Sequence, residues 1–303
     1  MVIFDQKKQL HRRFSVKPWI LAARPKTLPA ALCPIAFAAA VALREEVTAW
    51  WLLLIIAVCA VIIQVICNYA NDLYDFLKGA DTEWRIGPLR AVQAGLISPV
   101  AMRRSLFVLV IVALLLGVVL VHAGGWPIVV IGIISLVAAF AYTSGPIPLA
   151  YVGLGELFVL IFFGPIPVYG TLLIVTGKPS FPPLVVSLGI SAIATALLVV
   201  NNIRDREQDA IAGKRTLAVR CGEPWCRYEY GVFIALAFLS LLVAWGSGAP
   251  SGVLAALPLL PLGVRMMRRV IYADDPVAWG GALAETVTLL VGYTLIVSIA
   301  WLL

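Results

Sequence analysis

The sequence predicts an all-α, polytopic membrane protein, and three observations support this fold class. The chain has 303 residues, of which 62% are hydrophobic and only 13% are charged. Its mean hydropathy of +0.99 lies far above the usual range of soluble proteins. The apolar residues also gather in runs of about 20, the length that one helix needs to cross a bilayer. We therefore expect a single integral-membrane domain over residues 1–303, a bundle of helices around a central cavity.

Nine apolar runs are long enough to be membrane helices, and charged or turn residues separate them. They lie at about residues 19–42, 49–72, 101–122, 126–143, 150–176, 181–202, 226–246, 250–270 and 281–303. The boundary at "HAGGWP" rests on Gly and Pro, which also occur inside membrane helices. One continuous helix across this boundary is therefore the alternative. The first run follows a basic N-terminus, as in a signal peptide. We expect it to stay as a helix, because prolines open it and many apolar runs follow.

The distribution of Lys and Arg predicts how the chain is oriented. Basic residues lie in the N-terminal segment and in alternate connections, near residues 78–104, 204–227 and 265–269. The opposite connections are short and nearly free of Lys and Arg. Because cytoplasmic loops carry the excess of positive charge, we expect a cytoplasmic N-terminus and an external C-terminus in the inner or cell membrane.

The net charge of +7 does not indicate a nucleic-acid partner. The basic residues flank apolar runs, and no basic patch with interleaved aromatic residues occurs. The five cysteines have no metal-ligand spacing, so we interpret them as small packing residues. The partner that the composition implies is the lipid bilayer.

Two polar motifs end the second and the sixth run. Asn68, Asp72 and Asp75 lie in "CNYANDLYDFLKGAD", and a similar trio, Asn201, Asp205 and Asp209, lies in "NNIRDREQDAIAGKRT". At about 100° per residue, each trio falls within an arc of roughly 60° to 80° on a helix. A carboxylate at the centre of a membrane costs roughly 2.5 to 3.5 kcal/mol, so we expect both faces to line a polar cavity or to lie at the membrane interface.

The two motif helices are four apart in the chain, and each precedes a basic loop. This spacing suggests diverged four-helix repeats, at about 19–143 and 150–270, followed by one extra helix. Independent origin of the two motifs is the alternative.

If the two faces meet, their oxygen atoms suit Mg²⁺, which prefers carboxylates, waters and substrate phosphates. Basic residues on the loops that follow would meet the charge of a diphosphate and make it a good leaving group. An apolar interior next to such a site favours an isoprenoid diphosphate. Its carbocation could be stabilised by aromatic rings, each by roughly 0.5 to 2 kcal/mol. The candidate rings are Tyr69, Tyr74, Tyr142, Tyr151, Phe158, Phe162 and Phe163.

These motifs resemble the two aspartate-rich motifs of the UbiA superfamily of intramembrane prenyltransferases. Four segments, "ARPKTLPAALCP", "NDLYDFLKGADTEWRIGPLRAVQAGLIS", "AYTSGPIPLAYVGLGELFVLIFFGP" and "NNIRDREQDAIAGKRTLAVRCG", are similar to the MenA branch. That branch comprises 1,4-dihydroxy-2-naphthoate polyprenyltransferases of menaquinone or phylloquinone biosynthesis. The likeness spans about residues 18–225.

The resemblance implies a Mg²⁺-dependent aromatic prenyltransferase that releases diphosphate and CO₂. It implies metal ligands at Asn68, Asp72, Asp75, Asn201, Asp205 and Asp209. Contacts to diphosphate, or ordering of the lid over it, would come from Lys78, Arg85, Arg90, Lys214 and Arg215. Asp81 would order a loop or act in the outer shell of the metal. Asp72, Asp205 and Tyr142 would act in catalysis, with Tyr142 beside the reacting carbon. Candidates for the aromatic acceptor are Arg24, Lys26 and Asn71.

Three alternatives stay open from the sequence. The acceptor could be 4-hydroxybenzoate, homogentisate or a tetrapyrrole, although "IGPLRAVQAGLIS" favours the naphthoate branch. Paired acidic helices also occur in cation transporters, but the basic loops here would repel a cation. Glu156 and Glu285 lie within apolar runs, where they could form a polar pair or face the cavity.

Overall fold

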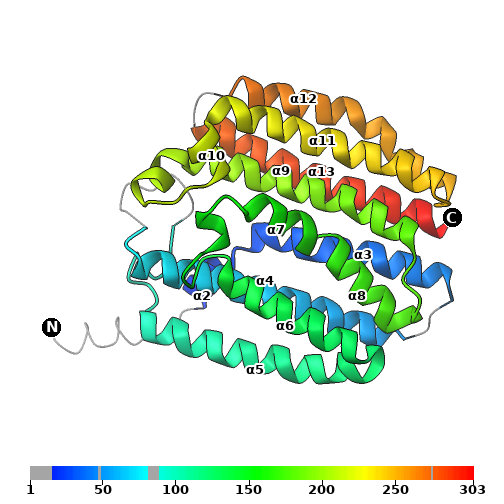
Figure 1. Ribbon diagram of the computed structural model, residues 1–303, viewed down its shortest axis with the longest axis horizontal. Helices are drawn as coiled ribbons and strands as arrows, with labels where there is room; N and C mark the ends of the chain where they lie inside the picture. The colour runs from blue at the N-terminus through cyan, green and yellow to red at the C-terminus, as the bar shows by residue number, and fades with distance from the viewer. Residues whose placement is uncertain (1–15, 47–48, 81–88, 274–275) are drawn as a thin grey trace.

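The computed structural model describes residues 16–46, 49–80, 89–273 and 276–303, and within them every regular element is a helix. The helices run side by side along the long axis of the molecule (Figure 1). Their bounds are α2 (Lys17–Ala23), η1 (Pro25–Thr27), α3 (Leu28–Arg44), α4 (Trp50–Leu77), α5 (Pro99–Gly124), α6 (Trp126–Ala141), η2 (Leu149–Tyr151), α7 (Gly155–Phe162), α8 (Pro165–Thr176), α9 (Phe181–Ile211), α10 (Leu217–Cys221), α11 (Glu223–Gly246), η3 (Ser251–Leu259), α12 (Leu260–Ile271) and α13 (Pro276–Leu302). The predicted all-α class is confirmed.

Seven stretches of the described chain are long and apolar enough to cross a membrane. They correspond to the first three predicted runs and to the fifth, sixth, seventh and ninth. The fourth run forms α6, which is apolar but shorter than the seven. The eighth run forms η3 and α12, and α12 carries Arg265, Arg268 and Arg269. The expected count of nine membrane-crossing helices is therefore not confirmed.

Two of the predicted helices are broken. Arg24 adopts a left-handed conformation at φ 51° and separates α2 from α3, since Pro25 follows it. Gly164 separates α7 from α8, and an added Cβ there would collide with the carbonyl oxygen of Ser187 on α9. Glycine at this position allows the broken helix to approach α9 closely.

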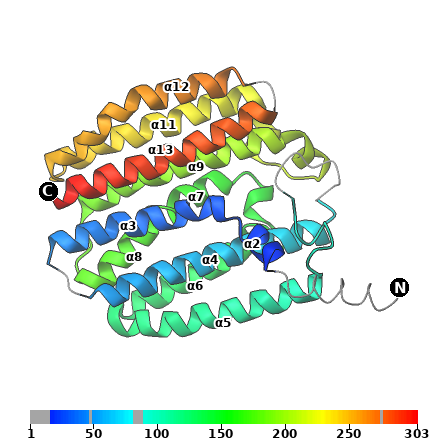
Figure 2. The same ribbon diagram turned by 180° about the vertical axis from the view of Figure 1, so that it is seen from behind.

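α9 is the central helix of the bundle. The apolar window of α9 is 83% buried, and the helix contacts α3, α7, α8, α11 and α13. Small residues such as Gly189 and Ser191 face its neighbours, which lets helix backbones approach in a membrane. In both views α11, α12 and α13 cover one side of α9, while α3, α7 and α8 lie between it and α4, α5 and α6 (Figures 1 and 2).

The two motif helices continue beyond their apolar runs. α4 ends at Leu77 rather than at 72, and α9 ends at Ile211 rather than at 202. Both helices run in the same direction, so their C-terminal ends lie at the same end of the bundle (Figure 1). Each polar motif therefore occupies the last turns of one continuous helix. The repeat relationship between the two halves stays a prediction.

Candidate active site

The ammonium of Lys214 joins the two motifs. Lys214 follows α9, and its Nζ lies 3.1 Å from Oδ2 of Asp75 on α4 and 3.4 Å from Oδ1 of Asp209 on α9. The side chain of Asp75 is fully buried, and those of Lys214 and Asp209 are only 10% and 13% exposed. The predicted convergence of the two acidic helix ends is therefore present in the fold.

Asp75 gathers further partners from distant parts of the chain. Nη2 of Arg90 donates to its Oδ2 at 3.1 Å, and the hydroxyl of Tyr151 donates to its Oδ1 at 2.9 Å. A buried carboxylate is stable only when it is paired and hydrogen-bonded in this way. Asp75 thus fixes three loops against the end of α4.

Asp72 organises the segment that carries Arg90. Its two carboxylate oxygens accept the backbone N–H groups of Ala91 and Val92, at 3.0 and 3.2 Å. Arg90 also donates to Oδ1 of Asn71 at 3.0 Å. Unlike Asn68 and Asn71, neither Asp72 nor Asp75 lines the adjoining cavity. A metal-binding role for these two aspartates stays a prediction.

The second motif holds its oxygen atoms at the cavity surface. Arg204 donates two hydrogen bonds to the two carboxylate oxygens of Asp205, at 2.7 and 2.8 Å. Nδ2 of Asn201 donates to the carbonyl oxygen of Leu197, one turn earlier on α9, at 3.0 Å. Asn201, Asp205 and Asp209 all line the cavity.

The two motifs enclose a cavity of about 620 Å³, which we call the polar cavity. Its cationic lining residues are Lys17, Arg24, Lys26, Arg90, Arg204 and Lys214. The carboxylates among its lining residues are those of Asp205 and Asp209. With six cations against two carboxylates, the polar cavity is suited to an anionic ligand.

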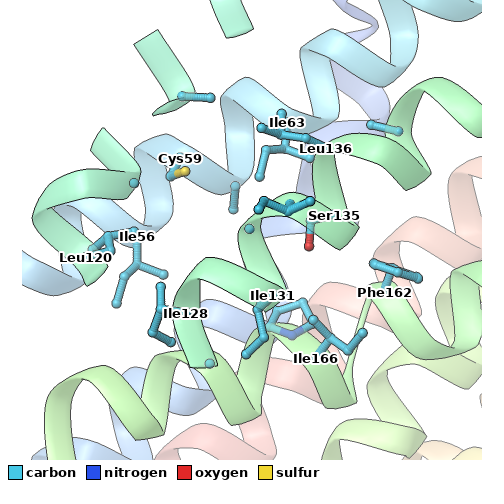
Figure 3. A pocket seen from close by; sticks show the side chains of 18 of the residues that line it. Ile56, Cys59, Ile63, Leu120, Ile128, Ile131, Ser135, Leu136, Phe162 and Ile166 are labelled. Carbon is cyan, nitrogen blue, oxygen red and sulfur yellow. The ribbon is translucent and has the colours of Figure 1, made fainter. Parts of the chain in front are cut away.

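A second cavity of about 460 Å³, the apolar cavity, adjoins the polar cavity. Its walls come from α3, α4, α5, α6, α7 and α8, with side chains such as Ile56, Ile131 and Phe162 (Figure 3). Gln64, Cys67, Phe158 and Phe163 line both cavities. The polar cavity and the apolar cavity therefore adjoin each other at these four residues.

An aromatic wall lies where the two cavities meet. The ring centroids of Tyr142 and Phe158 are 5.3 Å apart, and Phe158 stacks on Phe162 at 4.5 Å. Tyr142 lines the polar cavity. The ring of Tyr69 instead packs at a tilt against Trp19, and its hydroxyl donates to the carbonyl oxygen of Trp19 at 3.1 Å.

The predicted cation residues divide into two groups. Arg24, Lys26, Arg90 and Lys214 line the polar cavity. Lys78 and Arg215 are exposed and do not line it. Arg85 and Asp81 lie outside the described residues.

Lys78 lies at the edge of the site. Its Nζ donates to the carbonyl oxygen of Thr143 at 2.8 Å and lies 4.5 Å from the centre of the Tyr151 ring. Partial desolvation lowers the pKa of Lys78; the carboxylate of Asp75 opposes this effect and the charge of Lys214 adds to it. Lys78 therefore holds the loop after Tyr142 close to Asp75.

Of the two alternatives left open for Glu156 and Glu285, a pair between them does not form. Glu285 pairs with Arg269 on α12, whereas Oε1 of the buried Glu156 accepts a hydrogen bond from Nδ2 of Asn202 at 2.7 Å. Asn202 also lines the polar cavity but was not among the predicted site residues, although it directly follows Asn201 in "NNIRD".

The chemistry of the lining residues fits a hard divalent cation. The amide nitrogen of Asn68 donates to the carbonyl oxygen of Ala23 at 2.8 Å, and that of Asn201 donates to Leu197. Both amide oxygens are therefore available to a ligand, and both residues line the same cavity as Asp205 and Asp209. No group of three or more His, Cys, Asp or Glu residues with metal-binding geometry occurs in the described part of the chain. The oxygens of Asn68, Asn201, Asp205 and Asp209 would form part of the coordination shell of Mg²⁺, and water and phosphate oxygens would complete it.

Comparison with known sequences identifies relatives along most of the chain. A model described as the UbiA prenyltransferase family matches residues 31–302. A 1,4-dihydroxy-2-naphthoate octaprenyltransferase from Haemophilus influenzae is 36% identical over 78% of this chain and 79% of its own length. An Escherichia coli enzyme with the same description is 34% identical over 89% of this chain and 90% of its own.

Solved structures share the fold. A UbiA homologue from Archaeoglobus fulgidus, bound to DMAPP and Mg²⁺, matches with a TM-score of 0.66 at 12% identity, covering 93% of this chain and 99% of the other. A digeranylgeranylglyceryl phosphate synthase matches with a TM-score of 0.64 at 16% identity, covering 95% and 97%.

Proposed function

The protein belongs to the UbiA prenyltransferase family, and we propose that it transfers a prenyl chain from an isoprenoid diphosphate to 1,4-dihydroxy-2-naphthoate. Diphosphate and CO₂ are the other products. The observation that carries the proposal is the polar cavity between the two motifs, which adjoins an apolar cavity. Identity of 34–36% to two naphthoate octaprenyltransferases supports this acceptor.

The two cavities match the two parts of the donor. Its diphosphate carries several negative charges, which the cations of the polar cavity would neutralise. Its hydrocarbon chain would lie in the apolar cavity, between α4, α6 and α8. The donor's first carbon would then lie near Phe158 and Phe163, which line both cavities.

Mg²⁺ is the cofactor that we assign to the motif oxygens. Asn68, Asn201, Asp205 and Asp209 would hold it at the wall of the polar cavity. When bound, Mg²⁺ supplies positive charge that stabilises diphosphate as a leaving group. In the related Archaeoglobus fulgidus structure, DMAPP and Mg²⁺ are bound together.

The cationic residues act on the leaving group. When the C1–O bond breaks, the electron pair stays on the diphosphate oxygen, and Arg90, Arg204 and Lys214 meet the developing charge. Because Asp75 and Asp209 already fix Lys214, its charge is preorganised for this step. The carboxylates also keep these cations in place between turnovers.

The aromatic wall acts on the donor's first carbon. An allylic carbocation next to Tyr142 and Phe158 would be stabilised by the ring faces, by roughly 0.5 to 2 kcal/mol for each ring. The apolar side chains around it exclude water, which would otherwise capture the cation. A ring carbon of the acceptor then bonds to C1. The electron pair of the ring–carboxylate bond returns to the ring as CO₂ leaves.

Acceptor binding requires a site for a carboxylate close to the donor. Arg24 and Lys26 line the polar cavity on the side of η1, and Asn71 lies on α4. Arg24 occupies the left-handed break between α2 and η1 and lines the polar cavity. We propose that Arg24 and Lys26 bind the carboxylate of the acceptor.

We place the protein in the inner or cell membrane with its active site near the cytoplasmic face. The motif end of the bundle carries Lys78, Arg90, Arg204 and Lys214, whereas the opposite connections are nearly free of basic residues. The excess of positive charge on one side supports a cytoplasmic N-terminus and an external C-terminus.

A product assay tests the proposal. Purified protein in nanodiscs receives Mg²⁺, prenyl diphosphates of several lengths, and one acceptor at a time: 1,4-dihydroxy-2-naphthoate, 4-hydroxybenzoate or homogentisate. We expect mass spectrometry to find a prenylated naphthol without its carboxylate, with one CO₂ for each diphosphate. Product from another acceptor alone would refute the naphthoate assignment. Ion flux without prenyl turnover would indicate a transporter.

A further inference from the structure

The hydrogen bond between Glu156 and Asn202 joins two elements far apart in the sequence. Glu156 lies in the first turn of α7 and is only 4% exposed. Its Oε1 accepts a hydrogen bond from Nδ2 of Asn202 on α9 at 2.7 Å. The carbonyl oxygen of Asn202 would be a poor neighbour for a carboxylate, which offers acceptor atoms. The contact therefore fixes the amide with its nitrogen towards α7.

The oxygen of this amide is the atom left for a ligand. Asn202 lines the polar cavity, and within the described ranges its Oδ1 accepts no hydrogen bond. An amide oxygen only accepts hydrogen bonds, so its partner must be a donor such as a hydroxyl group. The cavity thus contains an acceptor atom that a second residue holds in position.

Asn202 lies at the border between the proposed metal site and the aromatic wall. At about 100° per residue it is turned by about 100° from Asn201 around α9, but by only about 20° from Asp209. Leu198 is one turn before Asn202 on the same helix. A Cβ added to Gly155 would lie 3.4 Å both from a methyl group of Leu198 and from the hydroxyl of Tyr142. Asn202 is therefore next to the aromatic wall.

Thr143 adds a second polar group to the polar cavity. It follows Tyr142, lines the cavity and is only 1% exposed. Its hydroxyl is buried and has no hydrogen-bond partner among the residues described. A buried hydroxyl without a partner costs roughly 1 to 3 kcal/mol, so a polar ligand in this cavity would relieve it.

We propose that Oδ1 of Asn202 accepts a hydrogen bond from a ring hydroxyl of the aromatic acceptor, and that Glu156 is the positioning residue for this amide. The inference rests on the proposed function, because it names the residue that recognises the positions of the hydroxyl groups on the acceptor ring. A naphthoate carboxylate only accepts hydrogen bonds and would be repelled by Oδ1. The ring hydroxyls are the groups of the acceptor that can donate to it.

The test compares acceptors that differ by one hydroxyl. The variant Asn202→Ala and the wild type each receive 1,4-dihydroxy-2-naphthoate, 1-hydroxy-2-naphthoate and 4-hydroxy-2-naphthoate. For each analogue, kcat/KM is divided by that of the dihydroxy compound, and this ratio is then compared between the two proteins. The intrinsic reactivity of the compounds cancels in that comparison. We expect the wild type to discriminate about three- to tenfold more than Asn202→Ala against one of the two analogues. The KM for the donor should stay unchanged.

Asn201→Ala is the matched control, because it removes the same side chain one position earlier. This variant should raise the Mg²⁺ concentration for half-maximal activity and keep the wild-type hydroxyl discrimination. Asn202→Ala should do the reverse. A rise in the Mg²⁺ requirement of Asn202→Ala with unchanged discrimination would make Asn202 a metal ligand and overturn the proposal.

Substitutions of Glu156 separate positioning from a merely structural role. Glu156→Gln keeps an acceptor oxygen for the amide and should keep the discrimination, whereas Glu156→Ala should lose it. The double variant Glu156→Ala/Asn202→Ala should discriminate no less than Asn202→Ala alone. A general loss of packing would lower turnover on all three acceptors equally and would leave the ratios at their wild-type values, which contradicts the proposal. If the wild type prenylates none of the naphthoates, the proposed function itself fails.

Discussion

Replacement of Lys214 by methionine tests whether one ammonium group holds the two motifs together. Lys214 makes one ion pair at 3.1 Å to the fully buried Asp75 and a longer one at 3.4 Å to Asp209. Removing one partner of a buried ion pair costs about 3 to 5 kcal/mol when the other is left unpaired. Asp75 keeps Arg90 and Tyr151, so the loss is closer to that of one charge-assisted hydrogen bond. We expect Lys214→Met to destabilise the fold by about 2 to 3 kcal/mol.

The assay is thermal unfolding in detergent, followed by intrinsic tryptophan fluorescence. A loss of this size corresponds to a fall in Tm of about 4 to 12 °C. The KM for the prenyl diphosphate should rise as well, because one of the six cations of the polar cavity is removed. Arg215→Met is the matched control: Arg215 is the next residue, but its side chain is exposed and does not line the cavity. An equal Tm and an equal KM in the two variants would refute the bridging role of Lys214.

Three further predictions concern the metal, the first motif and the donor tail. Asp205→Ala should abolish prenyl transfer while the protein stays folded, because it removes a proposed Mg²⁺ ligand; full activity would exclude Asp205 from the site. Asp72→Ala should also abolish transfer, and it should lower Tm because the backbone N–H groups of Ala91 and Val92 lose their acceptor; an unchanged Tm would contradict that contact. Gly132→Phe should place a ring in the apolar cavity, where a Cβ meets no atom within 4 Å. Turnover of long donors should then fall relative to that of a five-carbon donor. An unchanged ratio between the two donors would show that the donor tail does not lie in this cavity.

The sequence predicted the helical class and the meeting of the two motifs, because both depend on local patterns. Hydropathy identified each run, and helical periodicity placed Asn68, Asp72 and Asp75 on one face. Periodicity does not say what that face contacts. In the fold Asn68 reaches the polar cavity, whereas Asp72 binds the backbone after Arg90 and Asp75 binds Lys214.

Hydropathy also underestimated the length of the motif helices. It measures where a chain is apolar enough for lipid, and α9 continues for several polar residues beyond that point, to Ile211. The breaks at Arg24 and Gly164 had proline signals next to them, but Pro also opens helices, so the sequence could not distinguish a break from a start.

Contacts between distant elements carried no signal in the sequence. Glu156 and Asn202 are 46 positions apart, and neither the periodicity of α7 nor that of α9 relates them. The same holds for Tyr151, which reaches Asp75 across 76 positions. Such contacts depend on how helices pack, and a single sequence does not specify that packing.

The most direct test of the central claim is an experimental structure with Mg²⁺ and geranyl thiodiphosphate, an unreactive analogue of the donor. We predict density for the diphosphate and metal in the polar cavity, in contact with Asn68 and Asn201 from the two motifs, and the geranyl chain directed into the apolar cavity. Diphosphate bound outside the space between the ends of α4 and α9, or metal held by one motif alone, would contradict a shared site.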